Sequence, residues 1–382
     1  MDGAEKVDEQ AKACSTGLQT VDLVRWHRLQ SVLLGSKRDF FSAGSSLCAL
    51  LLALAGCSHQ VRPHRKEPFP EKLSSWRLFT GNPAALRPNQ GVVPYDLNSP
   101  LFSDYASKFR FVWMPKGASA LYRADDTFDF PVGTIFSKTF AYPTATGRRL
   151  IETRLLVHAE AGWTPLPYVW NPGQTEAYLD VAAAGTQVQY GGRTIDYIIP
   201  NTNQCKECHN QAKITLPIGP KARNLNKDFD YETGRENQLA HWIRIGYLRR
   251  VPPPDRVAKL AQWDDPQSGT LSDRALAYLE ANCAHCHNPN GAAGASGLYF
   301  NAGPQDSLRL GVCKVPVSAG LGSGNLRFDL VGGNPAQSIL YFRMNSIEPK
   351  VMMPEIGRTV IHREGLELIG QWIRSVSGDC AR

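Results

Sequence analysis

Short runs rich in Val, Ile, Phe, Tyr and Thr dominate the first half of the chain. Glycine, proline and asparagine separate these runs, which occupy residues 109–115, 127–143, 148–170 and 193–200. The runs are typical of β-strands, and the residues between them are typical of turns. The pattern fits an antiparallel sandwich or barrel, and we predict a sandwich-like, β-rich domain over residues 76–200.

Helical spacing of apolar residues marks the C-terminal part of the chain. Leu276, Leu279 and Cys283 fall on one side of a predicted helix. Ser272 or Asp273 is the predicted cap of its N-terminus. A second predicted helix rests on the apolar residues Leu366, Ile369, Trp372, Ile373 and Val376. These patterns predict a multidomain chain in which a mainly α region follows the β-rich domain.

The N-terminal region has the pattern of an exported lipoprotein. A short basic stretch precedes an apolar segment, residues 47–55, which is too short to span a bilayer as a permanent helix. The sequence from Leu54 to Cys57 resembles the bacterial lipobox, so residues 37–57 are a predicted lipoprotein-type signal peptide. Cys57 would then carry lipid and hold the protein on a membrane surface. A simple buried helix is the alternative interpretation.

Two polar segments flank this predicted signal peptide. Signal sequences begin at or close to their basic stretch, but residues 1–36 lie upstream of it. A mis-assigned start is our preferred explanation of these extra residues. A short amphipathic helix over residues 23–34 is the alternative. Residues 58–75 contain proline and are interpreted as a linker. Ser58 after Cys57 resembles lipoproteins sent to the outer membrane, which predicts a location in the periplasm of a Gram-negative bacterium.

Charge says little about the partners of the chain. The net charge is +7 and the hydrophobic content is 42%, but Lys and Arg are scattered and form no long run. We therefore predict no binding to nucleic acid. A basic face for an acidic redox partner is one interpretation of the charge, and an ordinary solvated surface is the other.

The chain carries the same spacing of two cysteines and one histidine twice. Residues 205–209 read CKECH, and residues 283–287 read CAHCH. On a helical turn, Cys at i, Cys at i+3 and His at i+4 project from one face, so the thiols can form thioethers with a haem while the imidazole binds its iron. We predict two covalently attached haem c groups. Their predicted attachment residues and proximal ligands are Cys205, Cys208, His209, Cys283, Cys286 and His287.

Two other chemistries use the same atoms. A four-cysteine zinc site would pair the two C-x-x-C units, but their separation exceeds the usual one and zinc would not require a histidine after each unit. A thioredoxin-like dithiol needs one C-x-x-C in an α/β context, whereas this chain has two, each with its histidine. Haem attachment remains the prediction, with residues 201–266 as the first haem segment and residues 267–382 as a second, cytochrome c-like haem domain.

Two short features resemble class I cytochromes c. Met352 and Met353 precede the last predicted helix, and Met353 is the preferred sixth ligand of the second iron because Pro354 fixes the backbone beside it. A thioether opposite histidine favours electron transfer, and simple core packing of either methionine is the alternative. The pair Gly219-Pro220 resembles the Gly-Pro whose backbone carbonyl orients a proximal imidazole, here that of the first motif.

The sixth ligand of the first iron stays open at this point. His241 is the histidine between the two motifs, and an iron with two histidines would have a lower potential than one with methionine. A helical histidine beside Trp242 that is buried with one hydrogen bond is an equal alternative. Met114 and Met344 are remote alternatives, and an open sixth position is another.

Nine cysteines become interpretable once the compartment is predicted. Cys313 and Cys380 remain after the lipid-bearing cysteine, the processed segment and the two motifs are assigned. In an oxidising periplasm this pair is a disulfide candidate, which would stabilise the fold by about 3–5 kcal/mol in the chain-entropy model. Two free buried thiols are the alternative, because the sequence gives no distance between them.

A resemblance to a known family rests on phrases that occur in order over residues 91–111, 130–143, 152–158, 200–211, 217–231 and 281–289. In these phrases the chain resembles bacterial exported diheme c-type cytochromes, whose physiological role is largely unassigned. The resemblance covers nearly everything after Cys57. It implies two covalent haems and an N-terminal region of unknown purpose, and it supplies no substrate.

These observations predict a membrane-anchored periplasmic diheme cytochrome that transfers single electrons. Its predicted partners are redox proteins, such as a periplasmic dehydrogenase or a terminal oxidase chain. One alternative is a diheme enzyme, peroxidase-like or the cytochrome partner of a dehydrogenase, which uses an open first haem. Another is a β-rich docking or ligand-binding module connected to the haems. No nucleotide loop or nucleophile elbow occurs in the sequence, so no separate catalytic residue is predicted.

Overall fold

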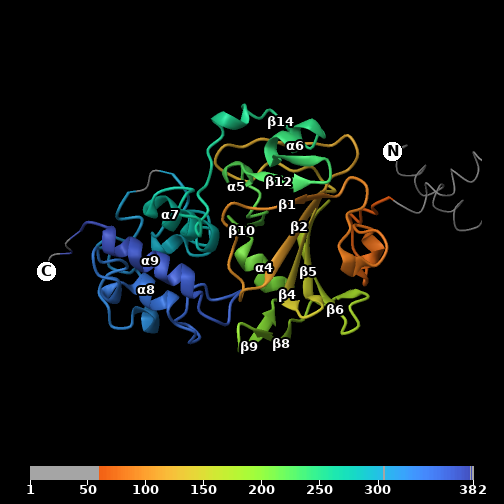
Figure 1. Ribbon diagram of the computed structural model, residues 1–382. Helices are drawn as coiled ribbons and strands as arrows, with labels where there is room; N and C mark the ends of the chain where they lie inside the picture. Colours follow the sequence, from red (N-terminus) through yellow and green to blue (C-terminus); the bar gives the residue numbers. More distant parts are fainter. Residues whose placement is uncertain (1–59, 304–305, 379, 381–382) are drawn as a thin grey trace, which may run out of the picture. The chain divides into compact units, whose positions relative to one another are not determined.

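A six-stranded antiparallel sheet is the central element of the fold (Figure 1). The computed structural model describes residues 60–303, 306–378 and 380. In the sheet, the strands follow the order β1-β2-β4-β5-β6-β7. Their bounds are β1 Val93–Tyr95, β2 Ser107–Trp113, β4 Ile135–Thr144, β5 Gly147–Ala159, β6 Gly162–Trp170 and β7 Ala177–Leu179. The predicted antiparallel, β-rich part of the chain is confirmed.

Small strand pairs and short helices make up the rest of the described chain. The pairs are β8 (Ala184–Tyr190) with β9 (Arg193–Ile199), β10 (Asn210–Gln211) with β11 (Ile214–Thr215), β12 (Asp228–Tyr231) with β13 (Gly234–Asn237), and the parallel pair β3 (Ala120–Leu121) with β14 (Leu248–Arg249). The α-helices are α4 (Thr202–Cys208), α5 (Ala222–Leu225), α6 (Gln238–Arg244), α7 (Leu271–Asn282), α8 (Ile339–Met344) and α9 (Arg363–Ser375). The 3-10 helices are η1 (Leu73–Trp76), η2 (Pro83–Ala85), η3 (Pro254–Arg256), η4 (Gly294–Ser296), η5 (Gly320–Ser323) and η6 (Pro335–Gln337).

The sheet buries a different core on each face. On β4, Ile135 belongs to a core that includes Trp76, whereas the next residue, Phe136, belongs to a core that includes Trp242. Successive side chains of a strand point to opposite faces, so both faces are covered. In Figure 1, the orange segment near residue 80 and helix α4 lie on opposite sides of the sheet. The covering layers are loops, short helices and two-stranded pairs, so the described residues contain no second large sheet of the kind that a sandwich requires.

The region after residue 200 is not the mainly helical one that we predicted. Within the described residues, α9 is its longest helix with 13 residues, and α8 is the only α-helix between α7 and α9. The long segments around α8 are rich in glycine, proline and asparagine, which favour turns over helix. The two predicted helices themselves are confirmed as α7 and α9, and they pack against each other.

The N-cap of α7 lies two or three residues before the predicted one. Thr270 is the N-cap, rather than Ser272 or Asp273. The Thr270 hydroxyl accepts the backbone N–H of Asp273 at 3.2 Å, and the Asp273 carboxylate accepts the Thr270 N–H at 3.0 Å. This reciprocal pair is a capping box, in which the acidic residue lies three positions after the cap.

Residues 60–382 form one compact unit, which joins the sheet to the C-terminal helices. Asp104, in the loop before β2, is buried, and its carboxylate accepts the backbone N–H groups of Thr359 at 2.7 Å and Val360 at 3.0 Å. Tyr105 beside it donates its hydroxyl to Glu364 at 2.8 Å. The loop before α9 is therefore anchored on the β-rich part of the chain.

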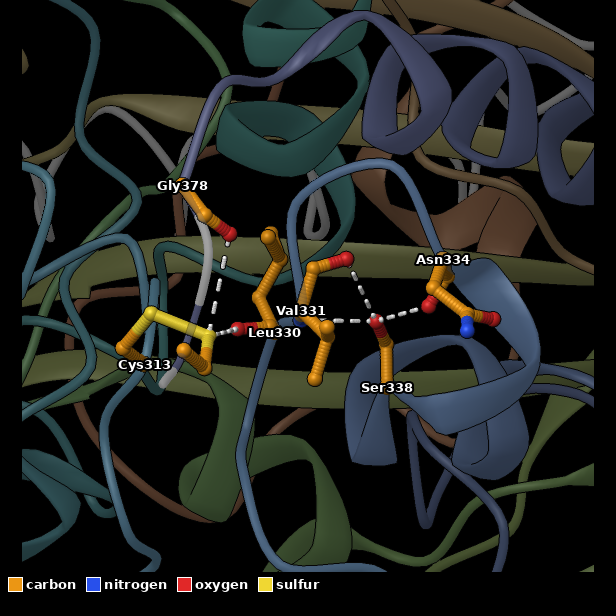
Figure 2. Close-up of a disulfide and its surroundings, with 7 residues drawn as sticks. Cys313, Leu330, Val331, Asn334, Ser338 and Gly378 are labelled. Carbon is orange, nitrogen blue, oxygen red and sulfur yellow. Dashed lines mark hydrogen bonds between the residues drawn. A yellow bond between two sulfur atoms is a disulfide. The ribbon is translucent and has the colours of Figure 1, made fainter. Parts of the chain in front are cut away.

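The structure joins Cys313 to Cys380 in a disulfide (Figure 2). The two Cα atoms are 5.0 Å apart. The backbone N–H of Cys313 donates to the carbonyl of Leu330 at 2.9 Å, so the disulfide lies beside a segment that is itself hydrogen-bonded. The bridge ties the end of the chain after α9 to the loop that follows the second motif.

The N-terminal predictions lie largely outside the described residues. These are the extension over residues 1–36 and the signal peptide over residues 37–57 with its lipid-bearing Cys57. The described part of the predicted linker, from Gln60 to residue 75, packs on the sheet, and Leu73 is fully buried there. Among the described residues, no helix has the length and apolar character needed to cross a membrane.

Candidate functional site

The first motif lies on α4 and the residue that follows it. Asn201 caps this helix by accepting the backbone N–H of Gln204 at 2.8 Å, in a capping box that fixes where the helix begins. The backbone N–H of His209 donates to the Cys205 carbonyl at 3.1 Å, so the helical turn continues through the motif. Helix α4 contacts β6 of the sheet. The thiols of Cys205 and Cys208 are free, and Cys205 is buried.

The imidazole of His209 is held by a backbone carbonyl. Its Nδ1 lies 2.7 Å from the carbonyl oxygen of Leu216, which leaves Nε2 free of this bond. Ala212 and Lys213 both have positive φ, as the tight turn of the β10–β11 hairpin requires, and this turn brings Leu216 back beside His209. The prediction that the Gly219-Pro220 backbone orients the His209 imidazole is therefore wrong. The hairpin places the Leu216 carbonyl beside the ring instead. Burial lowers the pKa of His209 to about 3.

The second motif continues directly from the C-terminus of α7. The backbone N–H of His287 donates to the Cys283 carbonyl at 2.9 Å, which makes residues 283–287 a helical turn. Nδ1 of His287 lies 3.2 Å from the Ser296 hydroxyl, and the ring stands edge-on to Phe300. Burial, with a smaller contribution from the Arg343 charge, lowers the pKa of His287 to about 4. Cys283 and Cys286 are free thiols.

One cavity receives side chains from both motifs. Its empty volume is about 1820 Å³, including space open to solvent. The lining includes Cys205, Cys208 and His209 of the first motif, Cys283 and His285 of the second, and Met353. The segments after the motifs are also joined, because the backbone N–H of Ala212 donates to the Asn290 carbonyl at 2.8 Å. The first motif and part of the second thus line one space, whereas Cys286 and His287 do not belong to the lining found in the described residues.

The loop that carries Met353 is fastened by a buried arginine. The guanidinium of Arg358 is 6% exposed and donates to the carbonyls of Met353 at 2.9 Å and Ser346 at 2.8 Å. The backbone N–H of Met353 donates to the Arg343 carbonyl at 3.0 Å. These bonds fix the backbone on both sides of the Met353 side chain, which lines the cavity. Met352 does not belong to the cavity lining found in the described residues.

Cationic side chains from neighbouring strands line the sheet side of the cavity. In the strand register, Arg110 on β2 lies opposite Lys138 on β4, and Lys138 lies opposite Arg154 on β5. Phe136 and Leu156, two residues from Lys138 and Arg154 on the same strands, share this face and are buried in the apolar core. The face of the sheet therefore changes from apolar to cationic where the cavity begins. The strands of the sheet contribute four cations to the lining: Lys108, Arg110, Lys138 and Arg154.

Carboxylates neutralise only part of this cationic row. Arg154 donates to Glu152 at 2.8 Å, and Arg110 donates to Asp96 at 2.9 Å. Lys138 forms no ion pair with any described residue. Burial, together with the charges of Arg154 and Arg110, lowers the pKa of Lys138 to about 7. The cavity wall therefore has more basic groups than carboxylates, and an anionic group there would favour the charged form of Lys138.

The other residues considered from the sequence lie away from the two motifs or in the core. His241 does not line the cavity; its ring stacks on Tyr231 at 3.5 Å, and its Nδ1 is hydrogen-bonded to Glu236. Met114 is buried in the core beside the sheet and is likewise absent from the described lining. Met344 on α8 belongs to the α7–α9 core and also reaches the cavity.

Two parts of the site were not predicted from the sequence. The cationic row lies on strands that read as ordinary β-structure, and only the register shows that its members are neighbours. His285 stands inside the second motif, between its two cysteines. The motif allows any residue at that position, so the pattern assigns His285 no role. A histidine at that position was the available signal.

Among the described residues, no group of three or more His, Cys, Asp or Glu side chains is arranged to hold a metal ion by itself. The four motif thiols form no disulfide with one another. Comparison with known proteins gives no match, whether to a family model, a curated protein or a solved structure. The chemistry of the site must therefore be argued from its own residues.

Proposed function

We propose that this protein is a diheme c-type cytochrome that carries single electrons between redox partners. The observation that supports the proposal most is that the first Cys-x-x-Cys-His turn and part of the second, Cys283 and His285, line one large cavity, and that all four motif thiols are free. A haem bound through such a turn supplies an iron that is oxidised and reduced by one electron. The protein contributes attachment, orientation and local charge to that group.

The first site fits a covalent haem in several respects. Cys205 and Cys208 would form the thioethers, and His209 would be the proximal ligand. The bond from His209 Nδ1 to the Leu216 carbonyl leaves Nε2 for the iron and fixes the plane of the ring. The excess cations of the sheet face would pair with the haem propionates. Lys138 would gain most from such a pairing, because it has no other ion pair among the described residues.

The second site fits a haem between α7 and the loop before α9. Cys283 and Cys286 would form its thioethers, and His287 would be its proximal ligand. Met353, which lines the same cavity as Cys283 in a loop that Arg358 fastens, would supply a thioether ligand. A methionine ligand raises the reduction potential and favours electron transfer over oxygen chemistry. The second haem region would in this sense be cytochrome c-like.

The proposed compartment is the periplasm of a Gram-negative bacterium, with a lipid on Cys57 as the membrane anchor. The disulfide between Cys313 and Cys380 supports this part of the proposal, because disulfides persist in oxidising compartments. The proposed partners are redox proteins, such as a periplasmic dehydrogenase or members of a terminal oxidase chain. The resemblance to exported diheme cytochromes agrees with the proposed compartment.

A spectroelectrochemical titration of the exported protein tests the proposal. We expect two reversible one-electron steps, low-spin spectra in both oxidation states and no turnover of peroxide. Carbon monoxide binding and peroxide turnover by the unmodified protein would instead support the enzymatic alternative. A protein without any haem absorbance after export with a haem-attachment system would contradict both.

Arg358→Ala is expected to loosen the loop that presents Met353. Removing the guanidinium leaves several buried carbonyls without their donor, and we expect a loss of stability on the order of 3 kcal/mol. The ferric protein should also lose the charge-transfer band of a sulfur–iron bond. Chemical denaturation and the absorption spectrum measure the two effects.

The exposed Arg327 provides a matched control for this prediction. It lies over the ring of Phe328 on the surface, so Arg327→Ala should change the free energy of unfolding by less than about 1 kcal/mol and leave the spectrum unchanged. An intact sulfur–iron band in Arg358→Ala would show that Arg358 does not position Met353.

A further inference from the structure

His285 is buried, whereas the residue at the corresponding position of the first motif is exposed. In the first motif the corresponding residue is Glu207, which lies on the surface. The His285 side chain is 8% exposed, and its Nδ1 has no hydrogen-bond partner in the described part of the chain. Buried polar atoms in native proteins are normally paired, so an orphaned imidazole nitrogen calls for an explanation.

The geometry of the motif gives the direction in which His285 points. Residues 283–287 form a helical turn, as the 2.9 Å bond from the His287 N–H to the Cys283 carbonyl shows. On such a turn the residues at i, i+3 and i+4 share one face, and the residue at i+2 lies on the opposite side. His285 therefore lies on another side of the turn from Cys286 and His287, neither of which lines the cavity that His285 and Cys283 line in the described part of the chain.

The first motif lies on that opposite side. His285 lines the same cavity as Cys205, Cys208 and His209. The backbone bond between Ala212 and Asn290 holds the segments after the two motifs together. The second motif thus presents the imidazole of His285 to the cavity that the first motif lines.

We propose that His285 is the sixth ligand of the iron held by Cys205, Cys208 and His209. This inference rests on the proposed function, since it requires a haem at the first motif. The first iron then has two histidine ligands. Because His285 stands between the two cysteines of the second motif, the irons are joined by a short covalent path through the backbone. That path suits transfer of an electron from the first iron to the second.

The other histidine candidates for this position are engaged elsewhere. His241 does not line the cavity and is held between Tyr231 and Glu236. His362 lines the cavity, but its Nδ1 lies 3.0 Å from the Tyr278 hydroxyl and its Nε2 lies 3.6 Å from the Glu364 carboxylate. Its ring also stacks on Phe102, with centroids 4.1 Å apart. Among the described histidines, His285 alone combines the cavity with an unpartnered buried nitrogen next to a second motif.

The test uses the full exported protein in three forms: unmodified, His285→Ala and His285→Met. The covalent haem count after denaturation is measured first and should be two in every form. In His285→Ala, one of the two haems should become high-spin and bind about one equivalent of carbon monoxide, and added imidazole should restore the low-spin spectrum. In His285→Met, one haem should shift to a higher potential and gain a second sulfur–iron band.

Controls separate failure of this inference from failure of the proposed function. His241→Ala should leave both spectra unchanged, and His362→Ala should leave both irons low-spin. Two haems with unchanged spectra in both His285 variants would overturn the ligand assignment and leave the diheme proposal intact. A high-spin signal in His362→Ala that imidazole reverses would reassign the ligand to His362. A haem count below two in the unmodified protein would instead contradict the proposed function.

Discussion

Replacing both Cys205 and Cys208 with alanine is expected to reduce the covalent haem content from two per chain to one. These are the thiols of the first motif, and both line the cavity. Without thioethers, any haem at this motif would be held only through His209 and would leave when the protein is denatured. The denatured protein, measured as the pyridine complex of its haem, gives the count directly.

The double variant should also lose much of its stability. The cavity is about 1820 Å³ in empty volume, open space included, and its wall carries uncompensated cations. A wall of that kind is unfavourable when nothing fills it, because without an anion Lys138 and its neighbours either repel one another or, as the lowered pKa of Lys138 indicates, give up a proton. The matched control is Cys283→Ala with Cys286→Ala, which should also lower the count to one but spare the haem beside the cationic row. A count of two in either double variant would contradict the attachment that we propose.

Glu280→Ala is expected to destabilise the protein by about 3–5 kcal/mol, because it breaks a buried ion pair from one side. Glu280 on α7 is 6% exposed and accepts two bonds from Arg223 Nε, at 2.9 and 3.0 Å. Lys221 donates to the same carboxylate at 3.2 Å, and so does the backbone N–H of Ala302 at 3.1 Å. Alanine would leave two buried cations without their anion. Chemical denaturation measures the loss.

An exposed pair serves as the control for Glu280. The side chains of Arg235 and Asp230 are 64% and 77% exposed, so Asp230→Ala should cost less than about 1 kcal/mol. Equal effects of the two substitutions would show that the Glu280 cluster contributes no more than a surface pair.

The stabilisation from Glu280 should also depend on pH in a defined direction. Burial alone would raise the pKa of Glu280, but Lys221 and Arg223 outweigh burial and hold it below its ordinary value. A carboxylate with a lowered pKa stabilises the fold above its ordinary pKa, and this contribution is lost as the pH falls through the lowered one. The difference in unfolding free energy between the unmodified protein and Glu280→Gln should therefore shrink in acid.

Local features of the site could be predicted from the sequence, because they depend on spacing along a few residues. Each Cys-x-x-Cys-His turn is such a feature, and so is the amphipathic face of α9 with Leu366 and Ile369, which is buried as its pattern predicts. The capping box of Thr270 and Asp273 was also within reach, since its spacing is visible in the sequence. The prediction instead placed the cap at Ser272 or Asp273, nearer to the apolar residues of the helix.

Features that depend on tertiary contacts could not be predicted in this way. Arg110, Lys138 and Arg154 are far apart in the chain, and only strand register makes them neighbours. The meeting of the two motifs depends on how α4 packs on the sheet and how α7 is anchored by Glu280. Sequence periodicity carries no information about such packing. The partner of His209 was missed for a similar reason, since it depends on the length of one small hairpin.

The most direct test of the account is peptide mass spectrometry of the mature, exported protein. We predict that two peptides, one containing residues 205–209 and one containing residues 283–287, each carry the mass of one haem. Pairing of the cysteines with each other, a bound zinc ion or unmodified peptides at both motifs would contradict the central claim.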